Sequence, residues 1–357
     1  MRFWLLILIV PSLALAEEKS QEIPNELFIR ALNWMKSENP EHRKAAYSTL
    51  QILNEAALPK FQTALFTAKT HHEKELSKVL SSPQSKDFKK LEPILEELAS
   101  ERSRVYDLIK IDYKKDPSEI KMLKTEVEGV SSLFKKASRM ADADFTALDK
   151  KLTEVATAIV ELTDELARIE NHHDGNEFEP DDSPLETRRK EVMEESFDGE
   201  RYLKFQDARA ALQGEIAAIE AAAKHNSASS WASSSQKDFA HLLNQERGLM
   251  GLRPLHLEEK LSAAATGHSQ DMESMGFFAH QSPVEGKETP KKRADEAEYG
   301  GGWSGENIYL GSSSHAAAFD AWFGSDGHRF IMYAKGPSEL GIGPVGRHWT
   351  MMTGRGR

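Results

Sequence analysis

Apolar residues recur at helical spacing through most of the first 225 positions. From residue 17 to residue 139 the chain is rich in Lys, Glu, Leu and Ala. The alternation of apolar and polar residues that marks a strand is almost absent there. The pattern predicts a helical region over residues 17–139. No reliable internal repeat is found, so a solenoid is not predicted.

A more regular pattern follows this helical region. The apolar positions are separated alternately by three and four residues, which is typical of a coiled-coil seam. They are Phe145, Leu148, Leu152, Val155, Ile159, Leu162, Leu166 and Ile169. A second stripe lies beyond an acidic, proline-containing loop and consists of Phe205, Ala208, Leu212, Ile216, Ile219 and Ala223. Because each stripe needs an apolar partner, we expect an antiparallel helical hairpin over residues 140–225.

The hairpin is followed by a serine-rich stretch, "HNSASSWASSSQ", whose composition is typical of a flexible linker. We predict this linker over residues 226–235 and take it as the main domain boundary. Ser235 and Asp238 have the spacing of a capping box, so a helix should begin directly after it. The final domain is then residues 236–357.

The final domain mixes helical and strand patterns. A helix is predicted from about Glu258 to Met275, and His268 falls on its apolar stripe, which favours a hydrogen-bonded core histidine. Short strand-like runs follow, and those flanking Gly346-Arg347 predict a closing hairpin. The whole chain is therefore predicted to be α+β, with an all-α, partly coiled-coil region before a mixed domain.

Residues 1–16 have the features of a secretory signal. One basic residue precedes an apolar run, and the segment ends in the small-x-small pattern Ala14-Leu15-Ala16, so cleavage is expected before Glu17. No later segment approaches the roughly 20 apolar residues of a membrane helix. We therefore expect a secreted or periplasmic protein with no transmembrane segment after cleavage.

The amino-acid composition excludes some covalent links and argues against one class of partner. The chain contains no cysteine, so neither disulfides nor a lipid-modified cysteine anchor can form. Its formal net charge is −11 and no basic stripe is present, which argues against a nucleic-acid partner.

Five motifs in the final domain occur in a characteristic order. They are "LLNQERGLMGLRPLHLEEKLSAAATGHSQDMESMGFFAHQSP", "TPKKRADE", "SGENIYLG", "AFDAWFGSDGHRF" and "ELGIG". Together they resemble the bacterial branch of the CAP superfamily, also called the SCP or cysteine-rich secretory protein family. The resemblance covers about residues 236–357. It implies an α-β-α sandwich with an antiparallel sheet between helical layers and an open cleft on one side.

The resemblance also implies the residues of the cleft. The histidine of "FFAHQSP" is His280, the glutamate of "GEN" is Glu306, and the histidine of "GHR" is His328. Many relatives carry a second glutamate at a position that is Ala317 here. Asp320 and His315 are nearby and could substitute, although neither matches the motif.

Two imidazoles and a carboxylate have more than one chemical use. They could form a partial site for zinc or another divalent cation, with His280 and His328 as ligands. They could equally form a hydrogen-bonded cluster without metal. In a hydrolase, the histidines would act as metal ligands or proton-transfer groups and Glu306 as the general base. Ser282 is a poor nucleophile candidate, because no oxyanion hole is evident and Ser-Pro is typical of a turn.

The preferred interpretation is an exported CAP-domain protein that acts as a binding or interaction module in the cell envelope or outside the cell. Its partner would be a lipid, a glycan, a peptide or an envelope protein. The first alternative is a metal-dependent hydrolase acting on peptide or cell-wall material. The second is a helical scaffold that oligomerises through the coiled coil.

Overall fold

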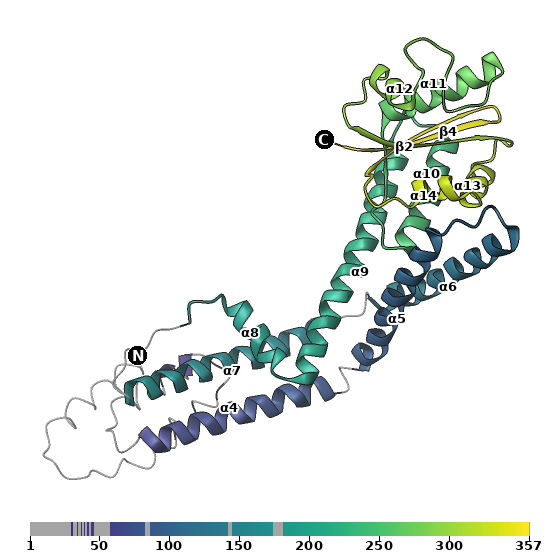
Figure 1. Ribbon diagram of the computed structural model, residues 1–357. Helices are drawn as coiled ribbons and strands as arrows, with labels where there is room; N and C mark the ends of the chain where they lie inside the picture. Colours follow the sequence, from purple (N-terminus) through teal and green to yellow (C-terminus); the bar gives the residue numbers. More distant parts are fainter. Residues whose placement is uncertain are drawn as a thin grey trace, which may run out of the picture. The chain divides into compact units, whose positions relative to one another are not determined.

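The chain folds into two compact units (Figure 1). In this computed structural model the described residues are a few positions between 30 and 45 and the ranges 58–82, 86–141, 145–173 and 181–356. The first unit comprises Met1–Lys89 and Asp144–Gln206, and the second comprises Lys90–Ala143 and Asp207–Arg357. The predicted signal sequence, residues 1–16, lies outside the described residues.

Three of the described helices lie wholly in the first unit. They are α4 (Leu58–Ser81), α7 (Thr146–His173) and α8 (Leu185–Glu194). The predicted apolar seam on α7 is buried from Leu148 to Leu162, and α7 packs mainly against α4 and α8. An ion pair between Arg188 of α8 and Asp164 of α7 ties those two helices together.

The predicted hairpin between the two apolar stripes is wrong. The second stripe lies on α9 (Phe197–Ala228), and its residues from 207 onward belong to the second unit. There Ile219 lies directly against Gly248 of the following helix, while the α7 seam packs against α4. Periodicity reveals that a helix has an apolar face, but it does not identify the surface that covers that face.

A four-stranded sheet forms the centre of the second unit. Its strands are β1 (His256–Leu257), β2 (Gly302–Leu310), β3 (Glu339–Val345) and β4 (His348–Arg355). Their order in the sheet is β1-β3-β4-β2. The predicted closing hairpin is confirmed as β3 and β4. The sheet is mixed rather than wholly antiparallel, because the short strand β1 pairs with β3 in parallel.

Helices cover both faces of this sheet, as the predicted α-β-α sandwich requires (Figure 1). One layer consists of α11 (Glu259–Met275) and α12 (Pro290–Glu296). The other consists of α10 (Ser234–Leu249), α13 (His315–Phe323) and α14 (Asp326–Met332). Helix α11 approaches β3 so closely that a Cβ on Gly341 or Gly343 would collide with its backbone. This close approach explains why the "ELGIG" motif has glycines at positions 341 and 343.

Two helices of the predicted helical region also belong to the second unit. They are α5 (Lys86–Ile109), whose residues from 90 onward lie in this unit, and α6 (Pro117–Ala141). Arg102 of α5 donates from Nε to the carbonyl oxygen of Leu249 at 2.8 Å and forms an ion pair with Glu215 of α9 at 2.9 Å. The sandwich is thus joined to α5, a helix that ends more than 100 residues before the sandwich begins.

The serine-rich stretch differs from the predicted flexible linker. Helix α9 continues through Ala228, and α10 begins at Ser234 with a capping box formed by Ser233 and Gln236 rather than by Ser235 and Asp238. Asn226 is buried and donates from Nδ2 to the carbonyl oxygen of Leu255 at 3.1 Å. Its Oδ1 accepts the amide of Leu257 at 2.7 Å. Serine-rich composition was misleading here, because local capping and these long-range bonds hold the segment in place.

We expect the substitution Asn226→Ala to lower the free energy of unfolding of the second unit by roughly 1–3 kcal/mol, because it leaves the Leu257 amide without its partner and the Leu255 carbonyl oxygen with Asn244 alone. Urea unfolding followed by tryptophan fluorescence measures the change. The matched control is Ser227→Ala, which removes an exposed hydroxyl and should change stability by less than about 0.5 kcal/mol. Equal stability of the two variants would show that the stretch is a linker after all.

Candidate functional site

Glu306 is a buried carboxylate in the middle of strand β2. Its backbone pairs with Met352 of β4, and its side chain is only 2 % exposed. A carboxylate removed from water in this way is stable only when it is paired and hydrogen-bonded. The environment of Glu306 must therefore supply positive charge or strong donors.

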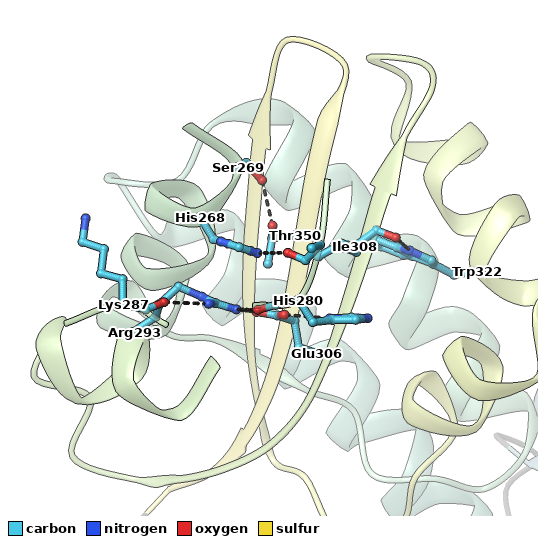
Figure 2. Close-up of polar contacts among 10 residues, drawn as sticks. His268, Ser269, His280, Lys287, Arg293, Glu306, Ile308, Trp322 and Thr350 are labelled. Carbon is cyan, nitrogen blue, oxygen red and sulfur yellow. Dashed lines mark hydrogen bonds and ion pairs between the residues drawn. The ribbon is translucent and has the colours of Figure 1, made fainter. Parts of the chain in front are cut away.

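Two side chains meet this requirement, one at each carboxylate oxygen (Figure 2). His280 Nδ1 lies 2.9 Å from Glu306 Oε1, and Arg293 Nη2 lies 2.6 Å from Glu306 Oε2. The Arg293 side chain is 1 % exposed, so the ion pair is fully buried. We call these three residues the His280–Glu306–Arg293 cluster. Glu306 is a cluster member rather than a solvated turn residue.

Arg293 is positioned by the short helix α12. Thr289 caps this helix by accepting the amide of Lys292, and Pro290 occupies its first turn. Arg293 then donates from Nη1 to the carbonyl oxygen of Lys287 at 2.9 Å and from Nη2 to that of His280 at 3.1 Å. The guanidinium therefore joins the loop before α12 to strand β2.

The role of Arg293 was missed by the sequence analysis. Its motif, "TPKKRADE", contains three consecutive basic residues, and a basic run normally indicates a solvated face. Lys291 and Lys292 do behave in this way, since they are exposed and pair with Asp295 and Glu288. The only signal for Arg293 is its place beside Ala294, which is also buried. That signal is weak in a helix of seven residues.

His328 lies close enough to His280 for the charge of His280 to act on it. The His280 side chain is 49 % exposed, with Nδ1 directed to Glu306. His328 lies half-buried on α14, and burial, followed by the charges of His280 and Lys115, lowers its pKa. Asn307, next to Glu306, donates from Nδ2 to the His328 carbonyl oxygen at 3.0 Å. The structure thus places His280, Glu306 and His328 near one another.

Asp320 does not substitute for the missing acid. Its side chain is 60 % exposed and pairs with Lys124 of α6 at 2.7 Å. Helix α13 turns Phe319 and Trp322 toward the core, which leaves Asp320 on the outward face. The prediction that Asp320 shares a cleft with Glu306 is therefore wrong, because this carboxylate serves the contact between α13 and α6.

Two other candidates have structural roles. His268 is completely buried, and its Nε2 donates to the carbonyl oxygen of Ala279 at 3.0 Å, which confirms the predicted core histidine. Burial, followed by the charge of Arg293, lowers its pKa. Ser282 accepts the amide of Val284 at 3.2 Å, in the turn predicted for it.

Glu306 does not fit the role of a metal ligand. Both of its oxygens are engaged, and the Arg293 guanidinium beside it would repel a cation. Within the described part of the chain, no group of three His, Cys, Asp or Glu side chains is placed to hold a metal ion. The zinc site considered from the sequence therefore lacks a suitable donor set.

Two surface hollows of the second unit lie away from this cluster. One of about 410 Å³ is formed by α9 and α10, and another of about 280 Å³ is formed by α9 and the loop after α10. Neither hollow contains His280, Glu306 or His328. The cluster and His328 therefore occupy a different part of the surface.

Residues 240–346 match the model of the cysteine-rich secretory protein family, CAP. Two curated proteins of Bacillus subtilis (strain 168) are similar to this part of the chain. The uncharacterized protein YkwD is 36 % identical over 126 residues, and the uncharacterized membrane protein YlbC is 31 % identical over 116 residues. The matched segments cover 35 % and 32 % of this chain, but only 48 % and 33 % of those proteins.

Two solved structures are also similar. One is an extracellular protein containing an SCP domain from Bacillus anthracis, with 29 % identity and a TM-score of 0.32 over 34 % of this chain and 40 % of that chain. The other is a cysteine-rich secretory protein from Staphylococcus aureus, with 17 % identity and a TM-score of 0.28 over 33 % and 37 %. With the family match and the observed sandwich, the chain carries a CAP domain in its C-terminal third.

We expect Glu306→Gln to destabilise the second unit by about 3–5 kcal/mol, because the Arg293 guanidinium stays buried without a counter-charge. Adding Arg293→Met should cost much less than the sum of the two single changes. Urea unfolding of the four proteins in this double-mutant cycle measures the coupling.

The neighbouring ion pair of Lys292 and Glu288 provides the control. It is exposed, so the corresponding cycle should give a coupling of at most about 1 kcal/mol. Additive losses for Arg293 and Glu306 would contradict the buried ion pair as a single unit.

Proposed function

We propose that the protein is exported and that its CAP domain is a binding module whose ligand contacts His280 and His328. The observation that carries this proposal is the half-exposed imidazole of His280, held by the buried pair of Glu306 and Arg293. A rigid support of this kind orients a surface group without the loss of side-chain freedom that normally opposes binding.

The support also determines which ring nitrogen of His280 remains available to a ligand. A neutral imidazole that donates from Nδ1 to a carboxylate leaves Nε2 as an acceptor. His280 can therefore accept a hydrogen bond from a ligand when neutral and donate one when protonated. This versatility suits a polar ligand such as a glycan, a peptide or a lipid headgroup.

A hydrolase is the second candidate, and the same pair supports it. A carboxylate that orients an imidazole is the arrangement of a general base, which would activate a water molecule directly. The described residues offer it little else, since Ser282 is engaged in a turn and Glu306 is not placed for a metal. Binding therefore remains the better-supported function.

Export is supported by the signal-like residues 1–16. The described helices include none that is long and apolar enough to cross a membrane. We expect protein recovered from the medium or the periplasm to begin at Glu17, as measured by mass spectrometry of the intact chain. Recovery of the chain only in the cytoplasm, still beginning at Met1, would contradict export.

Binding can be measured by co-sedimentation with purified peptidoglycan sacculi and with vesicles of phosphatidylethanolamine and phosphatidylglycerol. We expect retention on one of them, weakened about tenfold or more in His280→Ala, as for a central contact residue. His241→Ala, a change at another exposed histidine, should bind like wild type. Equal binding by both variants would contradict the proposed site, and His280-dependent release of soluble fragments from sacculi would favour the hydrolase.

A further inference from the structure

The loop between α5 and α6, residues 110–116, is fixed to the helix that carries His328. Asp326 accepts the amide of Tyr113 at 3.2 Å through Oδ1 and that of Lys114 at 3.0 Å through Oδ2. On the other side of His328, Arg329 donates from Nε to the carbonyl oxygen of Ile109 at 3.0 Å. Asp326, two residues before His328, is thus bonded to the loop, and Arg329, directly after it, is bonded to the end of α5.

These contacts are buried and reinforce one another. The Arg329 side chain is fully buried and also donates from Nη2 to the Ile111 carbonyl oxygen at 2.8 Å. The same nitrogen lies 2.6 Å from Asp326 Oδ1, and the guanidinium lies over the ring of Tyr113. The position of the loop beside His328 is therefore fixed by a network rather than by one exposed contact.

The backbone of the loop is unusual at two consecutive lysines. Lys114 has φ 49° and Lys115 has φ 61°, a left-handed conformation that residues with a Cβ rarely adopt. Asp326 stabilises it through the Lys114 amide, which Asp112 also accepts at 2.9 Å. Such a conformation persists only where the surroundings impose it, and it often marks a functional site.

The charges around His328 are unbalanced. His280 and Lys115 both act on His328, and Glu306 is neutralised by Arg293. Three acids of the loop and of α14 are engaged: Asp326 and Asp112 accept loop amides, and Asp116 accepts the amide of Ser118 at 2.8 Å. In the part of the chain that the structure describes, Lys115 forms no ion pair. His328 Nδ1 is buried there without a hydrogen-bond partner.

We infer that the loop between α5 and α6 forms part of the ligand site and that Lys115, with His280 and His328, selects a ligand bearing an anionic group, a carboxylate or a phosphate. This inference rests on the proposed function of the same site. An anion there would pair with the Lys115 ammonium, which forms no ion pair with any described residue, and would favour the protonated form of the nearby imidazoles. The selecting residue would come from the helical region outside the family match.

The test is a histidine NMR titration of the full chain with inorganic phosphate and with acetate, at constant ionic strength. In Lys115→Gln we expect the pKa of His328 to rise, because a charge that opposes its protonation is gone. Affinity for the anion should fall about threefold to tenfold, the effect of one partly screened charge. Saturation by phosphate alone would identify a phosphate-bearing ligand, and saturation by acetate would identify a carboxylate.

Lys114→Gln is the matched control, since it removes the same charge one residue away and should leave both quantities unchanged. If His280→Ala weakens anion binding and Lys115→Gln does not, the inference is overturned while the proposed site stands. If neither anion binds saturably, the inference is also overturned. In that case co-sedimentation with sacculi or vesicles still decides the proposed function independently.

Discussion

The buried ion pair between Glu306 and Arg293 is the interaction on which the candidate site depends. A carboxylate in the middle of a strand and a guanidinium on a short helix would each be unstable in this interior alone. Paired, they join β2 to α12 and to the loop that carries His280. The position of the half-exposed His280 imidazole is a consequence of this pairing, since its Nδ1 uses the remaining carboxylate oxygen.

A second buried arginine performs the corresponding task on the other side of the site. Arg329 joins α14, which carries His328, to the end of α5 and the loop after it. In both places a guanidinium uses several donors at once to satisfy carbonyl and carboxylate oxygens that water cannot reach. The two histidines are therefore held by buried polar contacts, whereas their own rings remain only partly buried.

Much of the sandwich could be predicted from sequence, because its signals are local. The stripe of α11, the hairpin around Gly346 and the buried His268 each follow from spacing or turn chemistry over fewer than 20 residues. The failures are long-range. The α7 seam and the α9 stripe have equivalent periodicity, and nothing in that periodicity indicates that the first packs against α4 while Ile219 of the second lies against Gly248 of α10. The prediction of a flexible linker at the serine-rich stretch failed for the same reason, since the partners of Asn226 lie about 30 residues away.

For the candidate site as well, the sequence motifs identified some residues correctly and failed for others. His280 and Glu306 were found through the family resemblance, and the structure does bring them into contact. Arg293 was hidden in a basic run, and Asp320 was misassigned because its partner, Lys124, lies almost 200 residues earlier. These errors concern charge, which decides what a site can bind. An unpaired Glu306 carboxylate would favour cations. Because Glu306 is paired with Arg293, the sign of the local electrostatic field depends on the imidazoles and Lys115 instead.

Similarity to other CAP domains is therefore better evidence for the fold of this domain than for the ligand that it binds. The family match ends at residue 346 and begins at residue 240, so it contains no part of α5, α6 or the loop between them. Yet that loop is bonded on both sides of His328 and adds a lysine to its surroundings. Relatives that lack an equivalent helical region would present the same histidines in a different field. Ligand preference should then vary among proteins whose motif residues are identical.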